Sequence, residues 1–152
     1  MKYTALADQP VATHEPTGFI SKYIWSQDHK VIAIQYALTA VFVGLVALAL
    51  SALMRLQLGF PDTFDFINPN SYLQFVTMHG MIMVIYLLTA ILLGGFGNYL
   101  IPLMIGARDM VFPYLNMLSY WTYLLAVIVL MASFFVPEGP TGAGWTLYPP
   151  DR

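Results

Sequence analysis

The chain has 152 residues, of which 59% are hydrophobic and only 9% charged, and its formal net charge is −2. Soluble domains carry about 25% charged residues, so this composition excludes an ordinary soluble domain and predicts an integral membrane protein in contact with lipid. The acidic balance argues against nucleic acid as a partner, and the absence of cysteine excludes disulfides and thiolate metal sites.

Residues 1–30 are polar and contain several Pro and charged residues, so we expect a retained cytoplasmic tail rather than a signal peptide. Three stretches without Asp, Glu, Lys or Arg follow, at about 31–54, 75–104 and 112–137. Each exceeds the roughly 20 residues that cross about 30 Å of hydrocarbon. The sequence therefore predicts an all-α membrane protein with three transmembrane helices, joined by loops at 55–74 and 105–113.

The distribution of basic residues predicts the orientation. The N-terminal segment carries three lysines, whereas the first loop carries only Arg55, at its border with the helix. This bias places the N-terminus and the second loop on the cytoplasmic or matrix side. His79 then lies near the outer surface, and Asp109 lies at the inner surface.

His79 lies in the otherwise uncharged second stretch. A titratable ring at membrane depth is costly unless something binds it, so it indicates a metal or cofactor ligand or a proton carrier. Neutral imidazole is a common ligand of haem iron, and Gly80 beside it would leave room for a wide group. The alternative is a histidine satisfied by its protein neighbours.

The first helix is expected to carry one stripe of small and polar residues, because their spacings are three or four. The stripe is Tyr36, Ala40, Gly44, Ala47, Ser51 and Arg55. Small residues favour close helix–helix packing in membranes. Alternatively, a flat bulky group lies against the small face and Arg55 reaches its electronegative edge.

The third segment supplies Asp109, Asn116 and Ser119, which share one helix face if the helix begins near Asp109. Pro113 suits a first helical turn. Asp109 is then either an N-cap or the mouth of a proton path that Asn116 and Ser119 continue by ordering water.

Glycines and aromatic residues mark the helix ends. Gly94, Gly95 and Gly97 indicate a loosened helix end or close packing. An aromatic belt at the membrane surfaces is expected from Tyr72, Trp121, Tyr123, Trp145 and Tyr148.

Four motifs closely resemble subunit I of the haem–copper oxidases, across nearly all of residues 20–150. They are Asp28-His29-Lys30, the run TMHGMIM at 77–83, GGFGNYLIPLMIGARDM at 94–110 and GWTLYPP at 144–150. That subunit is a bundle of about twelve transmembrane helices. The resemblance implies that residues 31–152 form its N-terminal region and that the chain is a fragment of the bundle.

The resemblance implies a low-spin haem a at the outer end, with His79 as one axial ligand. Arg55 would hydrogen-bond its formyl group and raise the haem's potential. The further implied haem contacts are Ser51, the face from Gly44 to Arg55, Tyr72 and Trp145. At the inner end, Asp109 matches the entrance of the D proton channel. Its lower lining matches Tyr36, Asn98, Asn116 and Ser119.

The implied activity is electron transfer from cytochrome c through haem a to a centre of haem a3 and copper B, which reduces oxygen to water with coupled proton pumping. The copper and high-spin haem ligands do not match this chain, so no catalytic residue is expected in it. The implied partners are the rest of subunit I, oxidase subunits II and III and cytochrome c. A bacterial inner membrane is favoured over a mitochondrial one.

Two departures bear on the resemblance. The best-known quinol oxidases carry Arg, Asp and His where this chain has Val46, Leu50 and Ser71, so cytochrome c is favoured over quinol as the donor. Gln57 stands where many members have a Glu that helps bind calcium or sodium, so that site is not assigned.

Two readings outside an active oxidase stay open at the level of the sequence. One is a non-enzymatic membrane segment of a channel, in which Asp109 and His79 would act as polar gates. The second is an inactive fragment. The channel segment would bind no haem, so low-spin haem absorbance of the full-length subunit separates it from the oxidase.

Overall fold

The computed structural model describes residues 18–61 and 63–148 of the chain. Three parts of the sequence interpretation lie outside these described residues. They are residues 1–17 of the expected tail, Asp62 of the first loop, and residues 149–152 with the last two prolines of the GWTLYPP motif.

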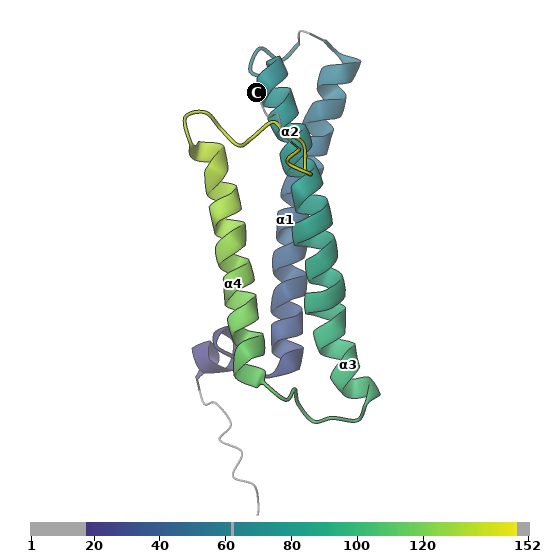
Figure 1. The fold of residues 1–152 in the computed structure, drawn as a ribbon, viewed down its shortest axis with the longest axis vertical. Coiled ribbons are helices and arrows are strands. Elements are labelled where there is room, and N and C mark those ends of the chain that lie inside the picture. The colour runs from purple at the N-terminus through teal and green to yellow at the C-terminus, as the bar shows by residue number, and fades with distance from the viewer. Residues whose placement is uncertain (1–17, 62, 149–152) are drawn as a thin grey trace, which may run out of the picture.

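Three long helical rods run along the vertical axis of the molecule (Figure 1). The first rod is α1 (His29–Gly59), which a short helical turn, η1 (Ile20–Ile24), precedes. The third rod is α4 (Pro113–Ala132), extended by the short η3 (Ser133–Phe135).

The second rod is continuous from Pro69 to Met104. It consists of α2 (Pro69–Met81), η2 (Ile82–Gly97), whose turns are of the wide π type, and α3 (Asn98–Met104). All three rods are long and apolar enough to cross a membrane. The predicted all-α architecture with three spanning helices is confirmed for the described residues.

The first two rods extend further into the first loop than the hydropathy pattern indicates. The carboxylate of Asp28 accepts a hydrogen bond from the Lys30 amide at 2.9 Å, so α1 begins at His29. At its other end α1 continues to Gly59, which places Arg55 inside the helix rather than in a loop. Asn68 caps α2 through the Ser71 amide at 2.8 Å, with a proline in the first turn. The predicted loop at 55–74 is therefore too long at both ends, because α1 and α2 both include polar residues beyond the apolar stretches.

Helix α1 packs against both other rods, through two buried clusters at successive levels. The cluster nearer the start of α1 is Ile32, Tyr36, Ala40, Ala90, Met117 and Tyr120. The cluster nearer the end of α1 is Val43, Ala47, Leu50, Met78, Ile82 and Val127. The opposite side of α1 presents large apolar side chains such as Leu38 and Phe42, each 66% exposed. An apolar outer surface of this kind suits hydrocarbon rather than water.

The glycine-rich end of η2 allows close packing. A Cβ atom at Gly94 would lie 2.5 Å from Cδ1 of Tyr36, so the ring of Tyr36 rests directly on the backbone of η2. The close packing that the glycines predicted is confirmed there. The wide turns of η2, over the stretch that ends at Gly97, also fit the alternative of a loosened helix.

Residues 136–148, here called the C-terminal segment, return from α4 to the outer end of α2 (Figure 1). The Gln74 side-chain amide donates to the carbonyl of Glu138 at 2.8 Å. The amide of Gly144 donates to the hydroxyl of Thr77 at 2.9 Å. These contacts bring Trp145 to the end of the bundle that carries His79.

Candidate functional site

The imidazole of His79 is oriented by the backbone of α1. Its Nδ1 lies 2.9 Å from the carbonyl oxygen of Ala47, which is fully buried. A carbonyl only accepts, so Nδ1 carries the proton and donates. In the neutral ring Nε2 then has a free lone pair, and it forms no hydrogen bond with any of the described residues.

This arrangement fits an iron ligand. A histidine that ligates a metal almost always donates its other ring N–H to a carbonyl, a carboxylate or water, which fixes the tautomer and the ring orientation. His79 has such a donor bond and a free Nε2. Over the described ranges, no three His, Asp or Glu side chains gather to hold a metal ion. His79 therefore suits a group such as haem, which needs a single axial ligand from this part of the chain.

Two polar side chains follow Ala47 along α1, at Ser51 and Arg55. Ser51 is half-buried and Arg55 is exposed. Neither side chain forms a hydrogen bond or an ion pair with a described residue, so both polar groups remain available to a ligand. Tyr72, on the first turns of α2, is half-buried and its hydroxyl is likewise free of described partners.

Two glycines were expected to leave room for a cofactor, but side chains of this chain pack against both of them. A Cβ atom at Gly44 would lie 3.0 Å from Cδ1 of Leu87, so the packing interpretation of the small stripe holds at Gly44. A Cβ atom at Gly80 would lie 2.9 Å from Cβ of Trp145. The expected space beside His79 is therefore taken by the indole of Trp145.

Asp109 lies in the loop between α3 and α4, with its side chain 46% exposed. Its Oδ1 accepts from the Met110 amide at 2.7 Å and lies 3.2 Å from Nδ1 of His29. The N-cap of α4 is Phe112, without a side-chain cap. The N-cap alternative for Asp109 is therefore wrong, and so is a helix that begins near it.

His29 is a site residue that the sequence interpretation did not assign. His29 is 1% exposed, and its Nε2 has no hydrogen-bond partner among the described residues. Its Nδ1 lies 3.7 Å from Asp28 as well as 3.2 Å from Asp109. In the sequence His29 sits in a polar segment far from Asp109, and only its place in the Asp28-His29-Lys30 motif singled it out.

A series of hydrogen-bonded polar groups connects α4 to α1 inside the bundle. The hydroxyl of Ser119 donates to the carbonyl of Asn116 at 2.7 Å. Because Ser119 has one hydroxyl proton, Tyr36 is the donor in the 3.0 Å contact between the two hydroxyls. Tyr36 itself is almost fully buried, between Gly94 and the rings of Tyr120 and Tyr123.

Tyr123 packs inside the bundle, where its hydroxyl donates to the Tyr86 carbonyl at 2.9 Å. It therefore does not join the expected aromatic belt.

Asp109 and Asn116 line one pocket of about 470 Å³, between the end of α3 and the start of α4. Nδ2 of Asn116 is buried and has no partner among the described residues. A buried amide beside a pocket is a usual binding place for water. The structure thus brings together four of the five predicted proton-path residues. Asn98, the first residue of α3, does not line this pocket and forms no side-chain hydrogen bond with a described residue.

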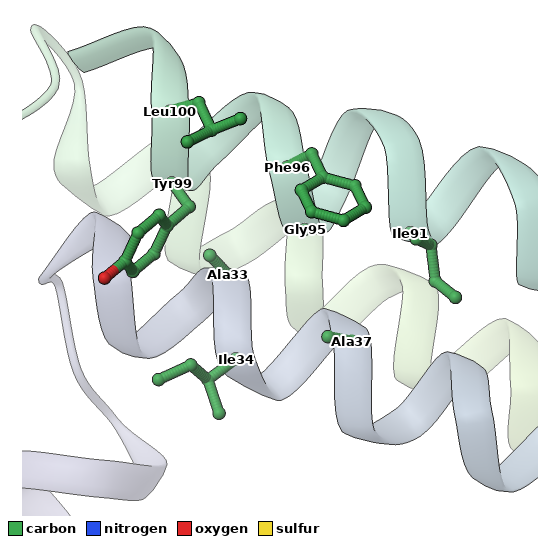
Figure 2. Close-up of a pocket in the computed structure, with 8 residues that line it drawn as sticks. All are labelled: Ala33, Ile34, Ala37, Ile91, Gly95, Phe96, Tyr99 and Leu100. Carbon is green, nitrogen blue, oxygen red and sulfur yellow. The ribbon is translucent and has the colours of Figure 1, made fainter. Parts of the chain in front are cut away.

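A second pocket, also of about 470 Å³, lies between α1 and the inner part of the second rod. Figure 2 shows its lining, in which the hydroxyl of Tyr99 is the one side-chain polar group. The remaining lining residues are Ala33, Ile34, Ala37, Ile91, Gly95, Phe96 and Leu100. This pocket contains none of the predicted site residues.

Comparison with known proteins gives consistent matches. Residues 31–151 match the family described as "Cytochrome C and Quinol oxidase polypeptide I". The chain is 71% identical to the alternative cytochrome c oxidase subunit 1 of Bradyrhizobium diazoefficiens, over 97% of this chain and 26% of that protein. It is 48% identical to cytochrome c oxidase subunit 1 of Thermostichus vulcanus, over 84% of this chain and 23% of that protein.

A third relative is the heme-copper oxidase subunit I+III of Aeropyrum pernix, which is 43% identical over 88% of this chain and 16% of that protein. The chain thus spans about a quarter, or less, of the length of these curated relatives.

Proposed function

The chain belongs to the cytochrome c and quinol oxidase polypeptide I family, and on that premise we propose that it forms part of the core subunit of a haem–copper terminal oxidase. In this oxidase a low-spin haem a, a haem a3 and copper B would supply the redox chemistry by which electrons from cytochrome c reduce oxygen to water. Proton pumping is coupled to this reaction. The relatives, which are named as oxidase subunits, support the proposal.

At the outer end, His79 would hold the haem iron through Nε2. The haem supplies a one-electron redox centre. The observation that carries this assignment is the 2.9 Å bond from Nδ1 to the Ala47 carbonyl, which orients the ring and increases its basicity as a ligand. Ser51 and Arg55 follow Ala47 on α1, and their polar groups have no partner among the described residues. They would contact the long side chain and the formyl group of the haem.

At the inner end, Asp109 would take up protons from the inner side of the membrane. His29 holds its carboxylate at 3.2 Å. Water bound at the Asn116 amide would then carry protons from the pocket toward Ser119 and Tyr36, whose hydroxyls are already joined at 3.0 Å. Asn98 is proposed as a further part of the lining, on the resemblance alone.

The proposed partners are the remaining helices of subunit I, oxidase subunits II and III, and cytochrome c. The 71% identity to a Bradyrhizobium protein supports a bacterial inner membrane as the location. Quinol is the competing electron donor. Turnover of the complete oxidase with reduced cytochrome c, and none with quinol, is the expected result.

The haem assignment is tested with His79→Ala in the full-length subunit of the assembled oxidase. We expect the loss of low-spin haem absorbance. His29→Ala, a second imidazole removed at the opposite end of the bundle, serves as the control and should retain that absorbance. Normal low-spin haem content in His79→Ala would overturn the assignment.

A further inference from the structure

The hydroxyl of Thr77 connects two segments of the outer end. Thr77 is fully buried on α2. Its Oγ1 donates to the carbonyl of Leu73 at 2.9 Å and accepts from the amide of Gly144 at 2.9 Å. The hydroxyl group thus donates its proton within α2, and one of its lone pairs accepts a hydrogen bond from the C-terminal segment.

The residue after Gly144 is Trp145, whose position follows from this contact. Gly144 has a φ of +86°, a left-handed conformation that favours glycine, and its carbonyl accepts from the Leu147 amide at 3.0 Å. The resulting turn directs Trp145 onto α2 at Gly80, where a Cβ atom would lie only 2.9 Å from Cβ and 3.1 Å from Cγ of the indole. Only a residue without a side chain accommodates this approach.

The rest of the C-terminal segment follows the same face of α2. Gln74 donates to the Glu138 carbonyl at 2.8 Å. A Cβ atom at Gly142 would lie 3.2 Å from Cβ of Leu73. The α2 residues in these contacts, Leu73, Gln74, Thr77 and Gly80, are spaced by one, three and three and share one side of the helix.

His79 lies on the same two turns of α2, but its ring reaches α1 at Ala47. The same short part of α2 therefore positions the imidazole of His79 on one side and the indole of Trp145 on the other. We propose that Thr77 is a positioning residue of the haem site, whose hydroxyl ties the C-terminal segment to α2 and so sets the place of Trp145 relative to His79. The haem part of this inference rests on the proposed function.

The test compares two threonines in the full-length subunit of the assembled oxidase. Thr77→Val keeps the shape of the side chain and removes the hydroxyl. Thr122→Val is the matched control, because Thr122 donates to the Leu118 carbonyl at 2.9 Å, four residues back, as Thr77 does to Leu73. No described residue from another segment donates to Thr122. Thr77→Ser, which keeps the hydroxyl, is the conservative rescue, and Thr77→Ala repeats the test if the valine variant assembles poorly.

Two readouts are measured. Hydrogen–deuterium exchange at the peptide that contains Gly144 should become about tenfold faster in Thr77→Val, as expected for the loss of one hydrogen bond. The absorption maximum of the low-spin haem should shift in the same variant, because the indole moves relative to His79. Thr122→Val and Thr77→Ser should leave both measurements unchanged.

Unchanged exchange at Gly144 in Thr77→Val would overturn the tie between the two segments. Faster exchange with an unshifted haem band would overturn the positioning role at the haem. The absence of low-spin haem from the unsubstituted oxidase would defeat the proposed function itself, whereas the exchange comparison would still decide whether Thr77 holds the C-terminal segment.

Discussion

Nδ1 of His29 lies 3.2 Å from Oδ1 of Asp109, across 80 residues of sequence. The ring is buried at the start of α1, whereas the carboxylate is partly exposed in the loop before α4. A carboxylate only accepts, so the imidazole donates through Nδ1 and holds Asp109 at the pocket that it shares with Asn116. The pair therefore fixes the carboxylate of Asp109 at a pocket of about 470 Å³.

Asp109→Asn is expected to slow proton uptake and oxygen-reducing turnover by about a hundredfold or more, because the amide cannot take up a proton at this position. The low-spin haem spectrum should stay intact, since Asp109 lies at the opposite end of the bundle from His79. Stopped-flow proton uptake and steady-state turnover of the assembled oxidase measure the effect. Unchanged uptake would contradict the entrance role of Asp109.

His29→Leu removes the donor to Asp109 and should slow proton uptake by about three- to tenfold, the range expected for a lost hydrogen bond of this kind. Because His29 would act only through Asp109, the double variant His29→Leu/Asp109→Asn should be no slower than Asp109→Asn alone. Additive losses in that double-mutant cycle would show that His29 acts independently of the carboxylate.

Arg55→Met tests the cation at the outer end of α1. Arg55 is exposed and, in the part of the chain that the structure describes, has no hydrogen-bond or ion-pair partner, so its guanidinium is available to the formyl group of the proposed haem. Loss of such a charge-assisted bond should lower the midpoint potential of the low-spin haem by about 60–120 mV and shift its absorption maximum. Arg108→Met, which removes an exposed cation in the second loop, is the control and should change neither quantity in a redox titration.

The three spanning helices could be predicted from the sequence because long uncharged stretches determine them almost alone. The helix ends could not. The starts of α1 and α2 depend on local capping by Asp28 and Asn68, and α1 continues through Arg55 to Gly59, beyond the apolar stretch. The N-cap alternative for Asp109 was also wrong, because α4 begins at Pro113 after Phe112, and Asp109 bonds to the Met110 amide.

His79 could be selected as a candidate from the sequence because it is an ionisable residue in an uncharged stretch, and its role as a ligand stays a prediction. Contacts between segments distant in sequence were not predictable from residue spacing. The pairing of His29 with Asp109 and the docking of Trp145 on Gly80 join such segments, and neither has a periodic pattern. Small residues at Gly44 and Gly94 did indicate close approach, but not that Leu87 and Tyr36 would be the side chains that fill the space.

Gly94→Ala tests how strongly the series of hydrogen-bonded polar groups between α4 and α1 depends on that close approach. The added methyl group would lie 2.5 Å from Cδ1 and 2.6 Å from Cγ of Tyr36, so the ring must move away from η2, and this movement would disturb its hydroxyl contact with Ser119. We expect a loss of about 1–3 kcal/mol of stability, typical of overpacking in a tight core, together with slower proton uptake. Gly97→Ala is the matched control, because its methyl group would meet its nearest neighbours at 3.5 and 3.9 Å, which is ordinary contact. Thermal inactivation of the purified oxidase and stopped-flow proton uptake compare the two variants. Equal behaviour of both would show that Tyr36 is not held by the backbone at Gly94.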